Sequence, residues 1–217
     1  MSKERSVALR DHEVAQILSG TRTQFVKPIK HRHGFKVYNR RSDAATIKEM
    51  NDTPIRIPLE EEADAKEYLL RHCPYGKTGG TLWVREAYAF VLEDKMGPVW
   101  DSIIYRADLG NEDWDGAWRP STNMNRSISR ITLEVADVKV QRLHEMTAED
   151  AVAEGITPHE MGEVASDTLF RIRGERWPGP VLQYAEKWVD MHGLASWESN
   201  PWVWRVTFRV QSSSPVR

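Results

Sequence analysis

The sequence contains one cysteine, Cys73, so no disulfide can form within the chain. A chain without disulfides is typical of a reducing compartment, and we expect a cytoplasmic protein. No apolar run approaches the roughly 20 residues that a membrane-spanning helix needs. The charged residues 1–5 lead into no apolar segment of the kind found in signal peptides. We therefore expect no membrane association.

Metal-binding and phosphate-binding motifs are also missing. His31 and His33, like His72 beside Cys73, match no spacing of a structural zinc site. The Gly-Lys-Thr-Gly-Gly stretch at 76–80 lacks the upstream glycine and the strand–loop–helix setting of a phosphate-binding loop. The sequence thus predicts neither a metal ion nor a cofactor.

The net charge is small, −2 over 217 residues, which alone argues against a nucleic-acid binder. The charges are segregated, however, because residues 14–42 contain no acidic residue and residues 43–67 are acidic. The basic residues of the first stretch are Arg22, Lys27, Lys30, Arg32, Lys36, Arg40 and Arg41. Such a segment can contact phosphates while the whole molecule stays near neutral. A solvated basic loop explains it equally well.

The hydrophobic pattern predicts an α+β protein whose strands do not alternate regularly with helices, which disfavours a parallel doubly wound sheet. Two-residue alternation predicts strands over 7–9, 81–91, 103–107, 129–143 and 202–211. Capping residues and helical spacing predict helices over 11–20, 59–71, 147–155 and 181–192. Residues 21–58 show no strong period and are predicted to be loops or an irregular insertion. Residues 108–126 are predicted to be a loop. Within 129–143 the apolar positions change from odd to even near 136–137, which predicts a β-bulge.

Glu86 shares a strand face with Leu82 and Val84. A carboxylate on an apolar face is costly unless it is paired or functional. A structural ion pair and a catalytic carboxyl with a raised pKa both remain open. The arginines that could pair with it are Arg22, Arg85, Arg126 and Arg130.

Several aromatic residues could stack on a base or could pack in the core. Trp83 and Arg85 share the strand face opposite Glu86, and both side-chain types stack on bases. Trp114 and Trp118 lie in a polar segment and could form a stacking lid. Trp202 and Trp204 alternate with polar residues and are predicted to be core residues.

Six segments together resemble a known family. They are Thr-Arg-Thr-Gln after Gly20, and the stretches 73–86, 105–108, 118–121, 124–135 and 200–208. The chain resembles the ASCH branch of the PUA-like superfamily, in particular the long ASCH-like proteins of bacteriophage and prophage genomes. The resemblance spans most of the chain and is weakest over 28–70 and 157–180.

This resemblance implies a small PUA-like β-barrel with flanking helices and an irregular insertion, and a cleft for RNA or a nucleoside. One domain would cover 1–211, with 28–70 and 157–180 as insertions and 212–217 as a disordered tail. Amidohydrolases of N(4)-acetylcytidine with this fold carry a lysine, a threonine and a glutamate at positions that fall here on Arg22, Phe25 and Glu154. Arginine is not a general base and phenylalanine is not a nucleophile, so the same route is not expected. Thr23 could replace the threonine only with a register shift.

Three functions follow as alternatives. The first is binding of nucleic acid or a modified nucleoside, RNA or single-stranded DNA, without hydrolysis. The second is a hydrolase, an amidohydrolase on acylated cytidine or a ribonuclease, and the third is a phage protein that binds a host protein. The candidate catalytic residues are Glu86, Glu154 and Thr23. The candidate binding residues are Arg22, Lys27, Trp83, Arg85, Trp118, Arg126 and Arg130.

Overall fold

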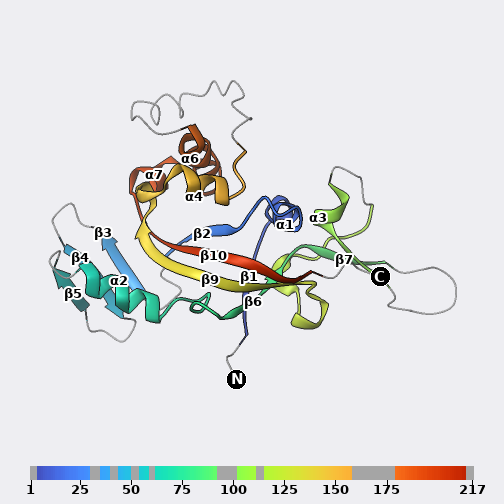
Figure 1. The fold of residues 1–217 in the computed structure, drawn as a ribbon, viewed down its shortest axis with the longest axis horizontal. Coiled ribbons are helices and arrows are strands. Elements are labelled where there is room, and N and C mark those ends of the chain that lie inside the picture. The colour runs from blue at the N-terminus through green and yellow to red at the C-terminus, as the bar shows by residue number, and fades with distance from the viewer. Residues whose placement is uncertain are drawn as a thin grey trace. The chain divides into compact units, whose positions relative to one another are not determined.

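The computed structural model describes residues 4–29, 35–39, 44–49, 54–58, 62–91, 102–110, 115–157 and 179–213 (Figure 1). The chain forms two compact units, and each unit is assembled from separate stretches of the sequence. The first unit comprises Met1–Thr23, Tyr75–Asp137 and Thr207–Arg217. The second unit comprises Gln24–Pro74 and Val138–Val206.

Helices and strands are mixed along the chain, as expected for the α+β class. The strands are β1 (Arg5–Ala8), β2 (Gln24–Pro28), β3 (Phe35–Asn39), β4 (Ala44–Glu49), β5 (Pro54–Pro58), β6 (Thr81–Arg85), β7 (Tyr88–Val91), β8 (Ser102–Tyr105), β9 (Ile131–Arg142) and β10 (Trp202–Ser213). The α-helices are α1 (Asp11–Leu18), α2 (Glu62–Arg71), α3 (Arg106–Leu109), α4 (Ala148–Ala153), α6 (Gly179–His192) and α7 (Leu194–Glu198). Short 3-10 turns occupy Ser121–Asn123, Arg126–Ile128 and Leu143–Glu145.

A curled five-stranded sheet with the strand order β1-β6-β9-β10-β2 confirms the α+β prediction (Figure 1). β1 pairs parallel with β6, and β6 pairs antiparallel with β9. Within β9 the buried apolar positions are odd-numbered at Leu133 and Val135 and even-numbered at Val140, so the apolar positions change phase as the sequence indicates. The strand itself is continuous, and the β-bulge stays a prediction.

The core of the first unit follows the predicted alternation of β6. Leu82 and Val84 are fully buried, and so are Ile131 and Leu133 of β9. The expected single strand over 81–91 is instead two strands, because the chain leaves the five-stranded sheet after Arg85 and pairs again in β7. β7 and β8 form a separate antiparallel pair.

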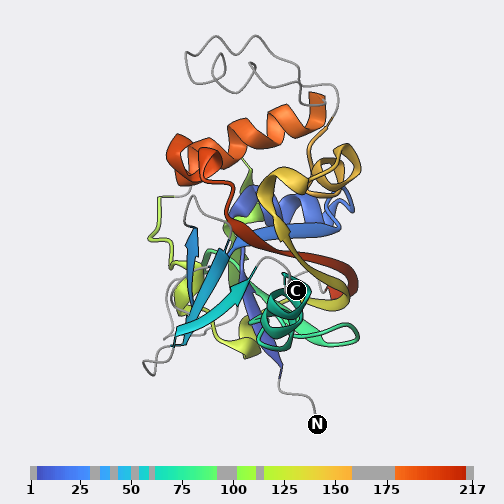
Figure 2. The same cartoon turned by 90° about the vertical axis from the view of Figure 1, so that its left-hand side faces the viewer.

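The second unit carries a helical cluster and a small sheet. α6 lies against α4 and α7 (Figure 2). It buries the side chains of Tyr184 and Trp188. β3, β4 and β5 form an antiparallel three-stranded sheet, and α2 contacts β5. The prediction of loops over 21–58 is therefore wrong for β2 to β5. Proline disfavours the interior of a sheet, but Pro28, Pro54 and Pro58 lie at the ends of the edge strands β2 and β5, where proline is tolerated.

Several element boundaries differ from the predicted ones. Arg10 rather than Asp11 caps α1, and the expected strand over 103–107 ends at Tyr105 because α3 begins there. β10 continues through Ser213, two residues beyond the predicted end. Trp202 and Trp204 are buried as predicted. Within the described part of the chain, no helix has the length and apolarity needed to cross a membrane.

Candidate functional site

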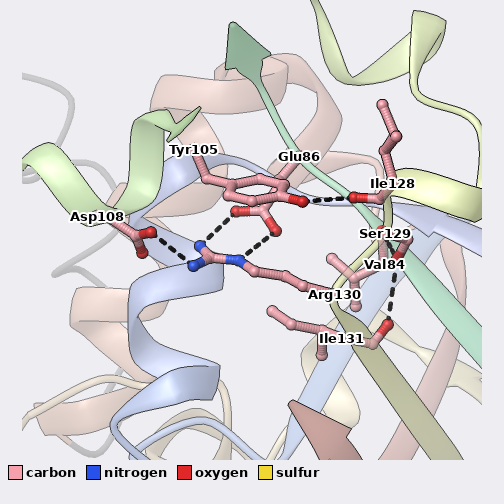
Figure 3. A network of polar contacts seen from close by, with 8 residues as sticks. All are labelled: Val84, Glu86, Tyr105, Asp108, Ile128, Ser129, Arg130 and Ile131. Atoms are coloured by element: carbon pink, nitrogen blue, oxygen red, sulfur yellow. Dashed lines mark hydrogen bonds and ion pairs between the residues drawn. The ribbon is translucent and has the colours of Figure 1, made fainter. Parts of the chain in front are cut away.

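Glu86 lies between β6 and β7, where its side chain points into the first unit and is 0 % exposed. Arg130, which directly precedes β9, donates from Nε to Oε1 of Glu86 at 3.0 Å and from Nη2 to Oε2 at 2.9 Å (Figure 3). Two parallel bonds between a guanidinium and a carboxylate fix both direction and distance. Of the four arginines considered as partners of Glu86, Arg130 is the one that forms an ion pair with it.

Arg130 also contacts Asp108 and Tyr105. Its Nη1 donates to Oδ2 of Asp108 at 2.6 Å, and its Cζ lies 4.1 Å from the centre of the Tyr105 ring. Asp108 belongs to α3 and its side chain is 45 % exposed, whereas the Arg130 side chain is 7 % exposed. One buried guanidinium thus joins a carboxylate in the interior to a carboxylate at the surface.

Backbone contacts hold this arrangement in place. The hydroxyl of Tyr105 donates to the carbonyl of Ile128, and the hydroxyl of Ser129 donates to the carbonyl of Val84 at 2.7 Å (Figure 3). The segment before Arg130 is therefore tied to both β6 and β8. The guanidinium has little freedom to turn away from Glu86.

Burial dominates the electrostatics of the cluster. Burial raises the pKa of Glu86, Arg130 opposes that shift, and the neighbouring carboxylates Asp108 and Asp11 raise the pKa further. Burial and Glu86 together raise the pKa of the Tyr105 hydroxyl. Asp11 is itself paired with Arg106 at 3.4 Å. Glu86 consequently combines an environment that favours its neutral form with an arginine that favours its charged form.

Two other candidate arginines have different acidic partners. Arg22 is buried and its Nη2 lies 3.1 Å from Oε1 of Glu13 in α1, so it forms a second interior ion pair of the first unit. Arg126 is 41 % exposed and its Nε lies 2.9 Å from Oε2 of Glu4. Neither of these ion pairs includes Glu86.

Trp83 and Arg85 lie together on β6 as predicted. The guanidinium carbon of Arg85 is 5.8 Å from the centre of the Trp83 ring, and its Nε donates to the carbonyl of Ser121 at 3.0 Å. Both side chains are half-buried, and so is Trp118. Trp114, the other residue of the proposed lid, lies outside the described residues.

The remaining candidates are scattered. Glu154 is the C-cap residue of α4, at the helix end as predicted, and it is buried in the second unit. Thr23 is exposed, and its carbonyl accepts a hydrogen bond from the backbone of Phe208. Lys27 is half-buried in β2. Of the basic stretch 14–42, Lys30, His31, Arg32, His33, Arg40 and Arg41 lie outside the described residues.

Sequence reasoning missed four residues around the site: Tyr105, Asp108, Phe90 and Arg119. The sequence predicts a polar loop from Asp108 onward, whereas Asp108 lies within α3, the short helix that directly follows β8. Arg119 lies over the Phe90 ring at 4.9 Å. No local pattern marks either contact, because each joins segments that are distant in the sequence. An Asp three residues after a strand-borne Tyr was the only available signal.

The chemistry open to Glu86 is limited by its partner. Both carboxylate oxygens accept bonds from Arg130, so acid–base work would require one of those bonds to break first. Asp108 is more accessible, since nearly half of its side chain is exposed. Among the described residues, no group of three His, Cys, Asp or Glu side chains comes together as metal ligands.

Comparison with known proteins adds no assignment to this geometry. The resemblance to ASCH proteins stays a prediction. No protein-family model, no curated protein and no solved structure matches the chain.

Proposed function

We propose that the chain binds nucleic acid or a modified nucleoside at the Arg130–Asp108 edge of the first unit and does not hydrolyse it. The observation that supports this proposal is the 2.6 Å contact between the buried Arg130 guanidinium and the exposed Asp108 carboxylate. A fixed carboxylate accepts a hydrogen bond from an exocyclic amino group of a base such as cytosine. Because Glu86 holds Arg130 from the other side, Asp108 is positioned before any ligand arrives.

The paired state of Glu86 favours binding over catalysis. A general base must reach the proton that it removes, and Glu86 is fully buried with both oxygens engaged by Arg130. Arg22 is likewise held by Glu13 in the interior. The PUA-like identity of the curled sheet belongs to the same proposal, because a sheet of this kind with a polar edge suits base recognition.

A titration with nucleosides and oligonucleotides tests the proposal. Cytidine, N(4)-acetylcytidine, RNA and single-stranded DNA are titrated at two salt concentrations into wild type, Asp108→Asn and Glu4→Gln. Asn keeps the size of Asp108 but lacks its charge, so binding should weaken about tenfold. Glu4 is an exposed carboxylate paired with Arg126 and serves as the matched control, whose substitution should leave affinity unchanged. Absence of wild-type binding even in low salt would refute the proposal.

Hydrolysis is the second candidate function, and the raised pKa of Glu86 is the observation that favours it. A raised pKa favours the protonated form of a carboxyl group, which is the form that a general acid needs. Wild type, Glu86→Gln and Glu154→Gln are incubated with N(4)-acetylcytidine and with RNA, and products are separated by chromatography. We expect no turnover. Turnover by wild type that disappears in either variant would replace binding by hydrolysis.

A further inference from the structure

Two arginines of the first unit lie over aromatic rings. The guanidinium carbon of Arg85 is 5.8 Å from the centre of the Trp83 ring, and that of Arg119 is 4.9 Å from the centre of the Phe90 ring. Both distances are within the range of cation–π attraction. A guanidinium stacked in this way is held as a flat surface, and its second face can accept another planar group.

The two arginine–aromatic pairs surround one small apolar cluster. Trp83 and Phe90 both pack against the buried residues Tyr88, Tyr105 and Met124. The segment that carries Arg119 also fixes Arg85, because the carbonyl of Ser121 accepts a bond from its Nε. The backbone of Arg119 in turn exchanges two hydrogen bonds with Tyr88 of β7. Both pairs therefore border the same apolar cluster of the first unit, and we refer to them together as its arginine–aromatic surface.

Neither guanidinium is neutralised by a carboxylate within the described part of the chain. The other arginines close to this surface differ, since Arg106, Arg126 and Arg130 each form an ion pair. Arg119 is exposed and Arg85 is half-buried. As far as the described residues extend, the surface thus carries two positive charges without an acidic partner, each beside an aromatic ring. An anionic ligand with planar groups complements it.

We propose that this arginine–aromatic surface, formed by Trp83, Arg85, Phe90 and Arg119, binds a single-stranded segment of nucleic acid. Unpaired bases stack on the two guanidinium groups and their rings, and the phosphates meet the two positive charges. A duplex fits less well because its bases already stack on one another. The inference rests on the proposed function and extends the ligand from one base at Asp108 to a strand of several nucleotides.

Fluorescence anisotropy with labelled oligonucleotides of about 12 nucleotides tests the inference. Single-stranded RNA, single-stranded DNA and a duplex are titrated into wild type, Arg85→Ala, Arg119→Ala, and the two arginine-to-lysine variants. Arg209→Ala is the matched control, because Arg209 is an exposed arginine of the same unit on β10. Circular dichroism melting shows whether each variant is folded.

Each alanine substitution should raise the dissociation constant for a single strand about tenfold. The lysine variants should bind more tightly than the alanine variants but less tightly than wild type. Lysine keeps the positive charge but lacks the planar guanidinium group that stacks on a base. Arg209→Ala should bind like wild type, and the duplex should bind more weakly than either single strand.

Two results would overturn the inference while leaving nucleoside binding intact. One is single-strand binding by Arg85→Ala and Arg119→Ala that equals wild type while Asp108→Asn still weakens it. The other result is that a polyglutamate peptide binds wild type and that the alanine substitutions weaken its binding by the same factor. That result would identify a protein ligand. If wild type binds none of these ligands, the proposed function itself is refuted.

Discussion

Arg130 is the residue on which the cluster of the first unit depends. It is the only described partner that compensates the interior charge of Glu86, and its contacts with Asp108 and Tyr105 add to the same network. Removing one member of a buried ion pair leaves the other charge without compensation. Exposed pairs behave differently, because water screens both charges.

Arg130→Met should therefore lower the free energy of unfolding by about 3 to 5 kcal/mol at neutral pH. Arg126→Met is the control, since it breaks the exposed contact with Glu4 and should cost less than about 1 kcal/mol. Urea unfolding of the two variants measures both values. Equal losses would show that the buried pair contributes no more than the exposed one.

The loss of unfolding free energy caused by Arg130→Met should depend on pH, because the Glu86 carboxyl is left without its partner. A Glu whose folded pKa is raised contributes stability that is complete below its unfolded pKa and is lost as the pH rises through the folded value. Burial already raises the pKa of Glu86 above 4.5 against the opposing effect of Arg130, so loss of Arg130 should raise it further. The deficit should thus shrink as the pH falls from 7 toward 4.5. A deficit that grows toward acid pH would contradict this sign.

At the scale of single elements, α4 shows how a short helix is fixed at both ends. The hydroxyl of Thr147 accepts a bond from the backbone of Asp150, and the Asp150 carboxylate accepts one from the backbone of Thr147, both at 3.2 Å. Asp150 also receives a 2.6 Å bond from Arg205 of β10. Beyond the helix, Gly155 adopts a φ of 81°, which favours glycine.

Thr147→Ala should lower the free energy of unfolding by about 1 kcal/mol, because one helical N–H loses its acceptor. Thr147→Ser retains the hydroxyl and should remain within a few tenths of wild type. Chemical denaturation followed by circular dichroism compares the two variants. A serine variant as unstable as the alanine variant would mean that the methyl group, rather than the cap, matters.

The elements that sequence reasoning found are those whose signal is local. Thr147 precedes acidic residues at the start of α4, and Trp202 and Trp204 alternate with polar residues in β10, so both elements were predicted. The strands β3 to β5 were missed because they are short, bounded by prolines or charges, and stabilised by pairing with one another.

The candidate site was predicted to a similar extent. Glu86 was identified from its position on an apolar strand face, and Arg130 was one of four possible partners. The choice among the four arginines depends on which distant segment reaches β6, and no local pattern records that. Asp108 and Arg119 were missed for the same reason, since their contacts are made across 22 and 29 positions of the sequence.

At the scale of the whole molecule, the chain passes between its two units at 23/24, 74/75, 137/138 and 206/207. Each unit therefore needs segments from both halves of the sequence. β6 of the first unit pairs with β9, and β10 contributes its end to the same unit. No cut at a single position leaves both units complete.

A fragment ending at residue 137 should consequently lack cooperative unfolding, because it is missing β10 and most of the second unit. Urea titration monitored by tryptophan fluorescence compares this fragment with the full chain. The full chain is the control and should show a sigmoidal transition. A sharp transition in the fragment would mean that its segments fold without the remainder.

Glu86 occupies the corner where the chain leaves one sheet and enters another. Because Arg130 pairs with Glu86 at that corner and with Asp108 just beyond β8, the β7–β8 pair is anchored at the end where β7 begins and β8 finishes. Changes in the length of the connection between the two strands can then accumulate without disturbing the anchor. Sequence variation among related chains should concentrate in that connection, while the corner around Glu86 should tolerate few substitutions.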